Sequence, residues 1–294
     1  MPGEPTRYQF EAIGTHWDIE IHQTLSAVAA TKLLQSVHDR IASFDRDYSR
    51  FRTDSLVTAM SLSAGTYQLP QDARPMMELY ETLYDLTDGA MTPLIGQVLV
   101  EAGYDADYSL KPGILHRPPT WSQVMAYTYP ELVLRQPALL DFGAAGKGYL
   151  VDIVSDLLRS ECFDSFSVDA GGDMVYQDSA GTPLRVGLEH PEDHDQVIGT
   201  IDLMGGSICA SAGNRRTWSD YHHIMHPQEL QPVRQVLAVW TTAPTALVAD
   251  GLATALFFAP GQMLQQHFDF EYLLLRPDYS VEQSAGFGAE LFTT

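Results

Sequence analysis

The chain has 294 residues, of which 45% are apolar, so it can bury a large core and is not a disordered segment. Its 38 acidic and 17 basic side chains give a formal charge of −21, which disfavours nonspecific binding to nucleic acid. No apolar stretch is long enough to span a bilayer, and the length allows one large domain or two small ones.

Hydrophobic periodicity predicts the elements of the first half of the chain. Alternating apolar residues indicate a strand over residues 15–21. Ser26 is a good N-cap for a helix that runs to about Phe44, and a second helix is predicted over residues 73–86. Residues 103–137 are rich in Tyr, Pro and polar groups, which is typical of irregular loops with short strands.

The second half alternates strands and helices less regularly. Its predicted elements are an apolar strand from Leu139, a glycine-rich turn, a helix to Leu158, two strands broken at Gly171-Gly172, a strand pair over 185–203, and then a strand, a helix and a strand over 235–241, 246–258 and 272–275. Because several strands follow one another in hairpin-like runs, the pattern favours the α+β class over a doubly wound sheet.

The glycine-rich turn is the first candidate binding element. Gly143, Gly146 and Gly148 allow close approach of a ligand, and the following helix N-terminus supplies free N–H groups. Lys147 adds a full positive charge, so the element suits a phosphate or pyrophosphate. The sequence contains neither the P-loop motif GxxxxGK[ST] nor the dinucleotide-binding motif GxGxxG. A tight strand–helix connection with a solvated lysine is the alternative.

Asp250 and Thr254 form the second candidate. Four residues apart in a predicted helix, they lie on one face, among Ala, Leu, Val and Phe. No Lys or Arg is close in sequence, so the carboxylate must meet water, hydrogen-bond donors or a metal ion. A carboxylate and a hydroxyl would suit magnesium beside phosphate oxygens. A solvent-exposed or capping Asp250 is the alternative.

Histidines and small-residue turns give weaker signals. The segment YHHIMHPQ, residues 221–228, holds three histidines but too little else for a zinc site, so one histidine in phosphate contact or proton transfer is favoured over exposed turn histidines. The turns at residues 171–173 and 211–214 would line a planar or phosphorylated ligand, although such turns often have no further role. Cys162 and Cys209 are expected to be reduced, buried thiols.

Eight short segments follow one another in the order of a known family pattern. They are Gly14 to Trp17, Ser49 to Ser55, Thr87 to Pro93, Asp141 to Tyr149, Asp169 to Asp173, Cys209 to Gly213, His222 to Pro227 and Ala249 to Phe257. The chain thereby resembles the FAD:protein FMN transferases, the ApbE family. The resemblance implies one ApbE-like (T-fold-like) α+β domain over residues 1–294, with largely antiparallel or mixed sheets flanked by helices.

The resemblance also implies a chemistry. Family members bind FAD and Mg²⁺ and transfer FMN to a Ser or Thr hydroxyl of an acceptor flavoprotein, releasing AMP. By this resemblance Asp250, Thr254 and the backbone carbonyl of Gly146 become metal ligands, and His223 lies near the reacting phosphate. We further expect His223 to remove the acceptor's proton. The implied flavin-binding positions are Gly14, Thr15, Ser49, Phe51, Thr92, Gly143, Gly146, Lys147, Gly171, Gly172, Asp173, Ser211, Gly213 and His223.

The chain departs from the family pattern at two carboxylates. Thr92 stands where the family has the Asp of FDP, and His226 where it has the Asp of HIxDP. Two alternatives to transfer therefore stay open: hydrolysis of FAD to FMN and AMP, and flavin binding without turnover. The first residues lack the regions of a signal peptide, so a cytoplasmic protein is expected unless a targeting segment is removed.

Overall fold

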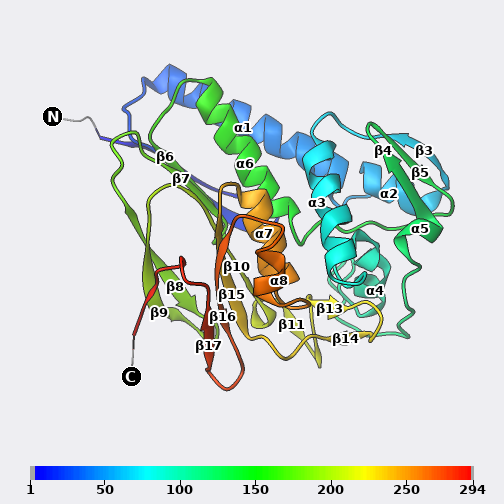
Figure 1. The fold of residues 1–294 in the computed structure, drawn as a ribbon. Helices are drawn as coiled ribbons and strands as arrows, with labels where there is room; N and C mark the ends of the chain where they lie inside the picture. Colours follow the sequence, from blue (N-terminus) through cyan, green and yellow to red (C-terminus); the bar gives the residue numbers. More distant parts are fainter. Residues whose placement is uncertain (1–3, 293–294) are drawn as a thin grey trace.

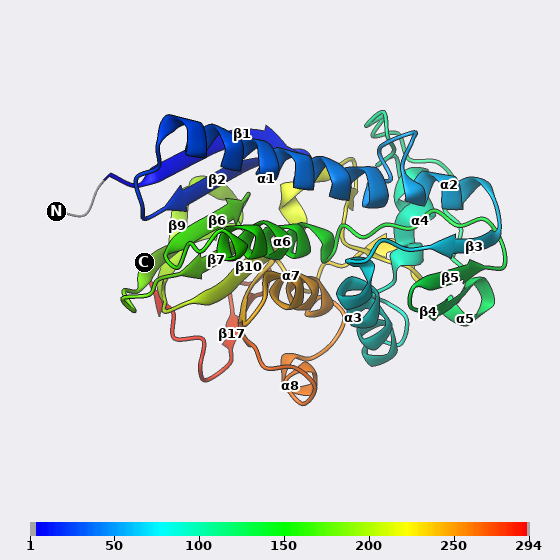
Figure 2. The same ribbon diagram turned by 90° about the horizontal axis from the view of Figure 1, so that it is seen from above.

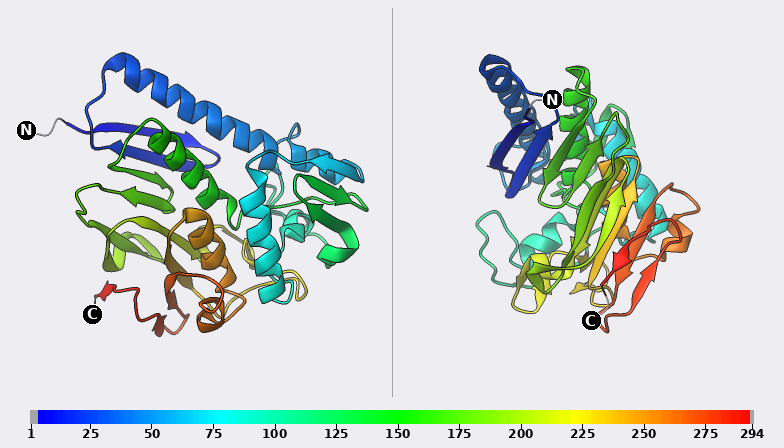
Figure 3. Two further views of the ribbon diagram at one scale, coloured as in Figure 1. Left: turned by 45° about the horizontal axis from the view of Figure 1, so that its top comes forward. Right: turned by 90° about the vertical axis from the view of Figure 1, so that its left-hand side faces the viewer.

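An eight-stranded antiparallel sheet forms the centre of the protein (Figure 1). The structure is a computed structural model, which describes residues 4–292 except for the side chains of His194 and Arg215. The strand order is β1-β2-β6-β7-β10-β15-β16-β17. Their bounds are β1 Thr6–Ala12, β2 Thr15–Ile21, β6 Phe166–Ala170, β7 Met174–Gln177, β10 Gly206–Ala212, β15 Ala238–Ala243, β16 Glu271–Leu275 and β17 Val281–Gln283. The first two strands thus form one edge of the sheet and the last strand forms the other (Figure 3).

Helices cover one face of this sheet. Figure 2 shows α1 (Ala27–Tyr48), α6 (Gly146–Ser160) and α7 (Ala246–Ala255) following one another across the strands, with α3 (Ala73–Leu86) beyond α7. In α1 the buried residues recur at helical spacing, at Leu33, Val37, Ile41, Phe44 and Tyr48. They join the main core, which includes the fully buried Trp17 and Ile19 of β2.

A smaller sheet covers the opposite face. It has the order β18-β9-β8, with β8 over Leu184–His190, β9 over Asp193–Leu203 and β18 over Glu290–Leu291. The alternation along β16 separates the two layers: Tyr272 and Leu274 belong to the core under the helices, and Leu273 and Leu275 to the core under the small sheet. The strands β7, β10, β15 and β16 of the large sheet are therefore buried on both faces.

The remaining elements lie beside this sandwich, mostly on the right of Figure 1. They are α2 (Leu56–Leu62), the sheet of β3 (Gly65–Gln68), β5 (Glu131–Leu134) and β4 (Met125–Thr128), α4 (Gly96–Glu101), α5 (Trp121–Val124), α8 (Gly261–Leu264), the 3₁₀ turns at Pro93–Ile95 and Gly213–Arg215, and the two-residue strands β11 (Thr217–Trp218), β12 (Tyr221–His222), β13 (Met225–His226) and β14 (Gln231–Pro232).

Most of the predicted elements are confirmed. The strand over 15–21 and the helix over 73–86 have the expected bounds, and the Ser26 side chain caps α1 by accepting from the Ala29 amide. The α+β class is confirmed, and every strand pair among residues 4–292 is antiparallel. No helix in this range is long and apolar enough to cross a membrane.

Two predictions are wrong. The segment from Leu139 is not a strand, because Leu140 and Phe142 are buried by packing against the helices, without a strand partner. Cys162 is exposed rather than buried. It follows α6 in the left-handed region, with φ of 66°, and the Phe163 amide closes the helix end on the Leu158 carbonyl, which turns the thiol outward.

Candidate functional site

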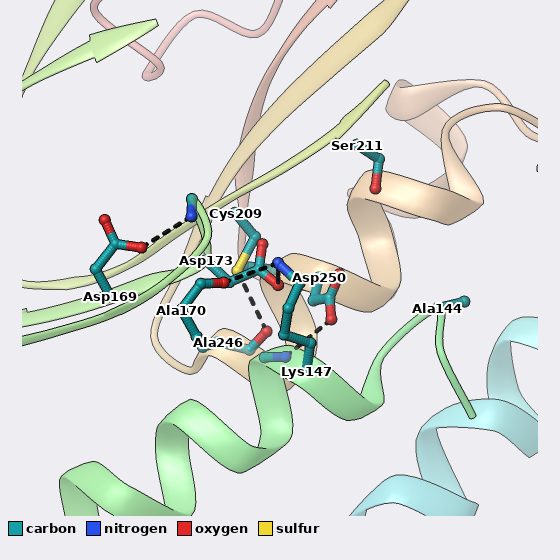
Figure 4. Close-up of polar contacts among 12 residues, drawn as sticks. Ala144, Lys147, Asp169, Ala170, Asp173, Cys209, Ser211, Ala246 and Asp250 are labelled. Carbon is teal, nitrogen blue, oxygen red and sulfur yellow. Dashed lines mark hydrogen bonds and ion pairs between the residues drawn. The ribbon is translucent and has the colours of Figure 1, made fainter. Parts of the chain in front are cut away.

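The glycine-rich turn enters α6 directly. Gly146 is the first residue of the helix, so Gly146, Lys147 and Gly148 form its first turn rather than a loop before it. The N-cap residue Ala145 has no side-chain acceptor to offer the free amides of this turn. The Gly148 amide instead donates to the Asp250 carboxylate on α7, over 2.9 Å (Figure 4). Asp250 therefore caps α6 from a position 102 residues away in sequence.

Lys147 points from α6 toward the turn between β6 and β7. Its ammonium group forms an ion pair with Asp173, which is fully buried, and donates to the Ala170 carbonyl over 3.1 Å (Figure 4). Burial alone would lower the pKa of Lys147, but the carboxylates of Asp173 and Asp250 raise it above its ordinary value. Lys147 is thus a charged partner for two buried carboxylates.

These three side chains leave a negative charge uncompensated. Asp250 is 4% exposed, and burial, followed by the nearby Asp173, raises its pKa well above the ordinary value. Two carboxylates face one ammonium group, so the ionised cluster carries a net charge of about −1. A buried charge of this kind favours a bound cation or a proton. The cluster therefore fits a divalent cation beside a phosphate group.

Neutral oxygen atoms complete the surroundings of Asp250. The Thr254 hydroxyl lies 3.4 Å from the Ser211 hydroxyl and 3.4 Å from the Ala144 carbonyl oxygen. Carboxylate, hydroxyl and carbonyl oxygens are the donors that Mg²⁺ prefers. The described residues contain no group of three His, Cys, Asp or Glu side chains that could hold a metal, so any such site depends on these neutral oxygens.

The sequence prediction for the carbonyl ligand differs from this arrangement. Gly146 opens α6, where backbone carbonyls accept hydrogen bonds from residues further along the helix. The carbonyl beside Thr254 belongs to Ala144, two residues earlier. Ala144 had no side-chain signal that could have identified it. The assignment of Gly146 as a metal ligand stays a prediction.

A second group of side chains surrounds Asp141, just before the glycine turn. The Gly143 amide donates to Asp141 over 2.7 Å, and the buried Arg50 forms an ion pair with the same carboxylate. Arg50 also donates to the Tyr104 carbonyl over 2.8 Å, and its guanidinium lies 4.2 Å from the centroid of the Phe51 ring. Sequence reasoning selected Phe51 and Gly143 but missed Arg50, although cations are scarce in this chain.

The three histidines of residues 221–228 have different environments. His222 is buried, accepts from the Ile224 amide at Nδ1 and is 3.0 Å from the Val233 carbonyl at Nε2, so its role is structural. His223 has a buried Nδ1 without a hydrogen-bond partner. Burial, assisted by Arg216, lowers the pKa of His223 to about 3, so its imidazole is neutral near pH 7. His223 therefore combines a ring nitrogen without a hydrogen-bond partner with weak basicity.

The predicted small-residue positions lie at two places. A Cβ on Gly171 would lie 2.0 Å from the Thr15 hydroxyl oxygen, so the β1–β2 hairpin packs closely on the β6–β7 turn. Gly172, with φ of 94°, donates to Asp169 over 2.8 Å. A Cβ on Gly213 would lie 3.2 Å from Nε2 of His222. Ser211 alone among these positions contacts a predicted metal ligand, Thr254.

Comparisons with known proteins identify the family of the chain. The model of the ApbE family matches residues 13–273. The chain belongs to the ApbE family. It is 25% identical over 280 residues to the FAD:protein FMN transferase of Vibrio cholerae, covering 87% of this chain and 81% of that protein. It is 27% identical over 308 residues to the FAD:protein FMN transferase of Treponema pallidum, covering 93% and 85% of the two chains.

Solved ApbE structures share the fold. The flavin transferase ApbE from Vibrio cholerae superposes with a TM-score of 0.82 at 20% identity, covering 97% of this chain and 99% of that one. The ApbE protein from Thermotoga maritima superposes with a TM-score of 0.82 at 21% identity, covering 97% and 98%. The α+β architecture is therefore that of the ApbE structures.

Thr92 and His226, the two expected departures from the ApbE pattern, each accept a local hydrogen bond. The Thr92 hydroxyl accepts from the Leu94 amide over 3.2 Å and caps the 3₁₀ turn that follows. Nδ1 of His226 accepts from the Glu229 amide over 3.3 Å at the turn after β13. Aspartate is a common acceptor at such caps and turns. Neither side chain supplies a carboxylate, but each accepts a backbone N–H.

Proposed function

We propose that this ApbE-family chain is a magnesium-dependent FAD:protein FMN transferase, which moves FMN from FAD to a Ser or Thr hydroxyl of an acceptor flavoprotein. The observation that carries the proposal is the contact of the Asp250 carboxylate with the Gly148 amide, beside Lys147 and Asp173. It brings an anion-binding helix N-terminus and an excess negative charge to one place. The activity named for the curated relatives supports the same conclusion.

The proposed reaction is a displacement at phosphorus. The hydroxyl oxygen of the acceptor attacks the FMN phosphorus of FAD, and the bond from this phosphorus to the bridging oxygen breaks. AMP leaves with that oxygen and its electron pair, and FMN stays on the acceptor as a phosphodiester. Mg²⁺, when bound, would neutralise the pyrophosphate charge. Positioning and charge neutralisation carry most of the catalysis in such transfers.

Residues of the chain have distinct roles in this proposal. Asp250, Thr254 and a backbone carbonyl near the start of α6 would hold the metal. Lys147 would oppose protonation of Asp250, and the first turn of α6 would face the pyrophosphate. His223, with its unpartnered Nδ1, would accept the proton of the attacking hydroxyl, which requires the bound anionic pyrophosphate to raise its pKa from about 3.

The test measures AMP and the covalently bound flavin separately. The protein is incubated with FAD and MgCl₂, with and without a flavoprotein that has an acceptor threonine. AMP is quantified by chromatography, and flavin on the acceptor by fluorescence of a denaturing gel. AMP that appears only with the acceptor, in equal amount to bound flavin, supports transfer.

Other outcomes would replace the proposal. AMP without acceptor would indicate hydrolysis of FAD, with water in place of the acceptor hydroxyl. FAD binding without AMP in either reaction would indicate a protein that binds flavin but does not turn it over. A parallel reaction with EDTA in place of MgCl₂ isolates the metal requirement, since AMP release that persists in EDTA would contradict magnesium dependence.

A further inference from the structure

Asp152 connects the two helices that carry the site. It lies on α6, and its carboxylate oxygens accept from the Ala246 amide over 2.8 Å and from the Leu247 amide over 2.7 Å. Ala246 and Leu247 are the first two residues of α7, whose amides have no partner within the helix. One carboxylate of α6 thus satisfies two free donors at the start of α7.

Further contacts hold the same end of α7. A Cβ on Gly148 would lie 2.2 Å from the Ala246 carbonyl oxygen, so only a glycine permits this approach of the two helices. The buried Cys209 thiol of β10 lies 3.6 Å from the same carbonyl oxygen (Figure 4). Asp250 follows Ala246 by about one helical turn and Thr254 by about two. The place of Ala246 therefore determines where both side chains lie relative to α6.

We propose that Asp152 is a positioning residue that fixes α7 against the first turn of α6, and so sets the affinity of the Asp250–Thr254 site for a divalent cation. The inference rests on the function proposed above. Asp152 itself does not contact any of the predicted metal ligands among the described interactions. It acts through the backbone of α7, because a small rotation of this helix would move Asp250 away from the Gly148 amide.

The charge of Asp152 agrees with this role. An ionised carboxylate is favoured at the positive end of a helix, here α7. Burial raises the pKa of Asp152 to about 6, because it outweighs the two backbone hydrogen bonds, which lower this pKa. Of the neighbouring charged groups on α6, Asp156 raises this pKa and Arg159 lowers it. The carboxylate is therefore ionised near pH 7 despite its burial.

The experiment compares Asp152→Asn with Thr245→Ala. The asparagine side chain has nearly the same shape but can accept from only one of the two amides while its NH₂ group opposes the other. Thr245 caps α7 as well, since its hydroxyl accepts from the Val248 amide over 3.4 Å, but it has no part in the α6 contact through Asp152. Both variants weaken an α7 cap, and only one releases α7 from α6.

Two measurements separate positioning from stability. Binding of Mn²⁺ to metal-free protein is followed by electron paramagnetic resonance of the free ion, and the Mg²⁺ concentration for half-maximal AMP release is measured with the acceptor present. We expect Asp152→Asn to weaken Mn²⁺ binding about tenfold and to raise the half-saturating Mg²⁺ concentration similarly, with kcat at saturating Mg²⁺ changed less than about threefold. Thr245→Ala should lower the unfolding temperature and leave Mn²⁺ affinity unchanged.

The outcomes distinguish the inference from the proposed function. Equal Mn²⁺ affinity of Asp152→Asn and the unaltered protein would overturn the role of Asp152. An equal loss of affinity in both variants would overturn it too, because helix stability would then explain the effect. Unaltered protein that binds Mn²⁺ but forms no AMP would overturn the proposed function alone, while the Mn²⁺ titrations would still decide the role of Asp152. Absence of Mn²⁺ binding to unaltered protein would overturn both.

Discussion

Asp250 is a carboxylate in surroundings that oppose its charge. Burial and the neighbouring Asp173 favour its protonated form, and Lys147 and the Gly148 amide only partly compensate. Perturbed groups of this kind are concentrated at functional sites, because the unfavourable interaction is relieved when a ligand binds. The same residue should therefore be needed for activity and unhelpful for stability.

We expect Asp250→Asn to separate these two properties. Magnesium-dependent AMP release should fall at least about 100-fold, because the amide cannot supply the negative charge of a metal ligand. The unfolding temperature in EDTA should stay the same or rise, because the amide carries no charge to desolvate. Chromatographic AMP assays and thermal unfolding would measure the two effects. Asp39→Asn, on the exposed face of α1, is the matched control and should change neither.

An unchanged rate of AMP release in Asp250→Asn would remove this residue from the metal site. A lower unfolding temperature in EDTA would show that the carboxylate stabilises the metal-free fold, contrary to the charge argument above.

Single residues with a distinctive local pattern could be predicted from the sequence. Asp250 and Thr254 were identified by their shared helical face, and Lys147 by its place in a glycine turn. The partner of Lys147 could not be deduced, because Asp173 reaches it only through the pairing of β6 with β7. Arg50, Ala144 and Asp152 were missed for the same reason: their contacts join distant segments and leave no mark in the local sequence.

At the scale of elements, the contact between α6 and α7 determines the geometry of the site. Gly148 allows it, since a Cβ there would lie 2.2 Å from the Ala246 carbonyl oxygen and 2.6 Å from Cβ of Asp250. Backbone atoms cannot move aside as a flexible side chain can. A methyl group at this position must therefore push the helices apart.

We expect Gly148→Ala to lower the free energy of unfolding by about 1–3 kcal/mol, which is the usual cost of forcing extra atoms into a packed core. Urea unfolding followed by circular dichroism would measure it. Gly146→Ala is the control for stability, because its Cβ would only make ordinary contacts, 3.7 Å from Phe142 and 3.8 Å from Phe44. Alanine also favours a helix over glycine. Equal loss in both variants would contradict the proposed steric cause.

The carboxylate between α6 and α7 should also make stability depend on pH. Burial raises the pKa of Asp152 in the folded protein to about 6, above its ordinary value of 3.8. The stabilisation that the protonated Asp152 side chain gives the folded protein is fully present below the pKa of the unfolded state, where both states are protonated. It is lost as the pH rises through the folded pKa of about 6. Between pH 5 and 7.5 the unaltered protein should lose about 1 kcal/mol relative to Asp152→Asn.

Urea unfolding of both proteins at half-unit steps of pH would measure this difference. Subtracting the free energy of unfolding of Asp152→Asn from that of the unaltered protein cancels the effects of the other titrating groups, because both proteins contain them. Parallel curves for the two proteins would show that the carboxylate has the same pKa in the folded and unfolded states.

Hydrophobic periodicity predicted the helices and strands that bury one complete face. It failed for a strand that is only partly buried and for a buried segment that pairs with no strand. The strand β1 was missed because it lies at the sheet edge, where only Tyr8 among its side chains is buried. A strand was wrongly expected from Leu139 because an apolar run looks the same whether it pairs in a sheet or packs singly under helices. Start and end signals were more reliable: Ser26 caps α1 as expected.

At the scale of the molecule, excess negative charge coexists with a large sheet whose strands β7, β10, β15 and β16 are buried on both faces. The formal charge of −21 is distributed over a surface that contains few cations to balance it. Repulsion among these carboxylates disfavours the folded state relative to the expanded chain. Added salt screens this repulsion, since the Debye length falls from about 10 Å at 0.1 M to about 3 Å at 1 M.

We expect the unfolding temperature in EDTA to rise by a few degrees between about 0.05 M and 0.5 M NaCl, because screening relieves the repulsion. Differential scanning calorimetry would measure it. KCl is the control and should act equally, since screening depends on ionic strength and not on which monovalent cation is present. A falling unfolding temperature would show that attractive ion pairs dominate the surface.

The order of strands has a consequence for how this chain matures on the ribosome. Half of the large sheet, from β10 to β17, is synthesised after residue 205, and Asp250 reaches Gly148 across 102 residues. A nascent chain that ends before α7 holds the glycine turn, Lys147 and Asp173 but lacks the second carboxylate and the Thr254 hydroxyl. The proposed metal site is therefore incomplete until α7 has been synthesised.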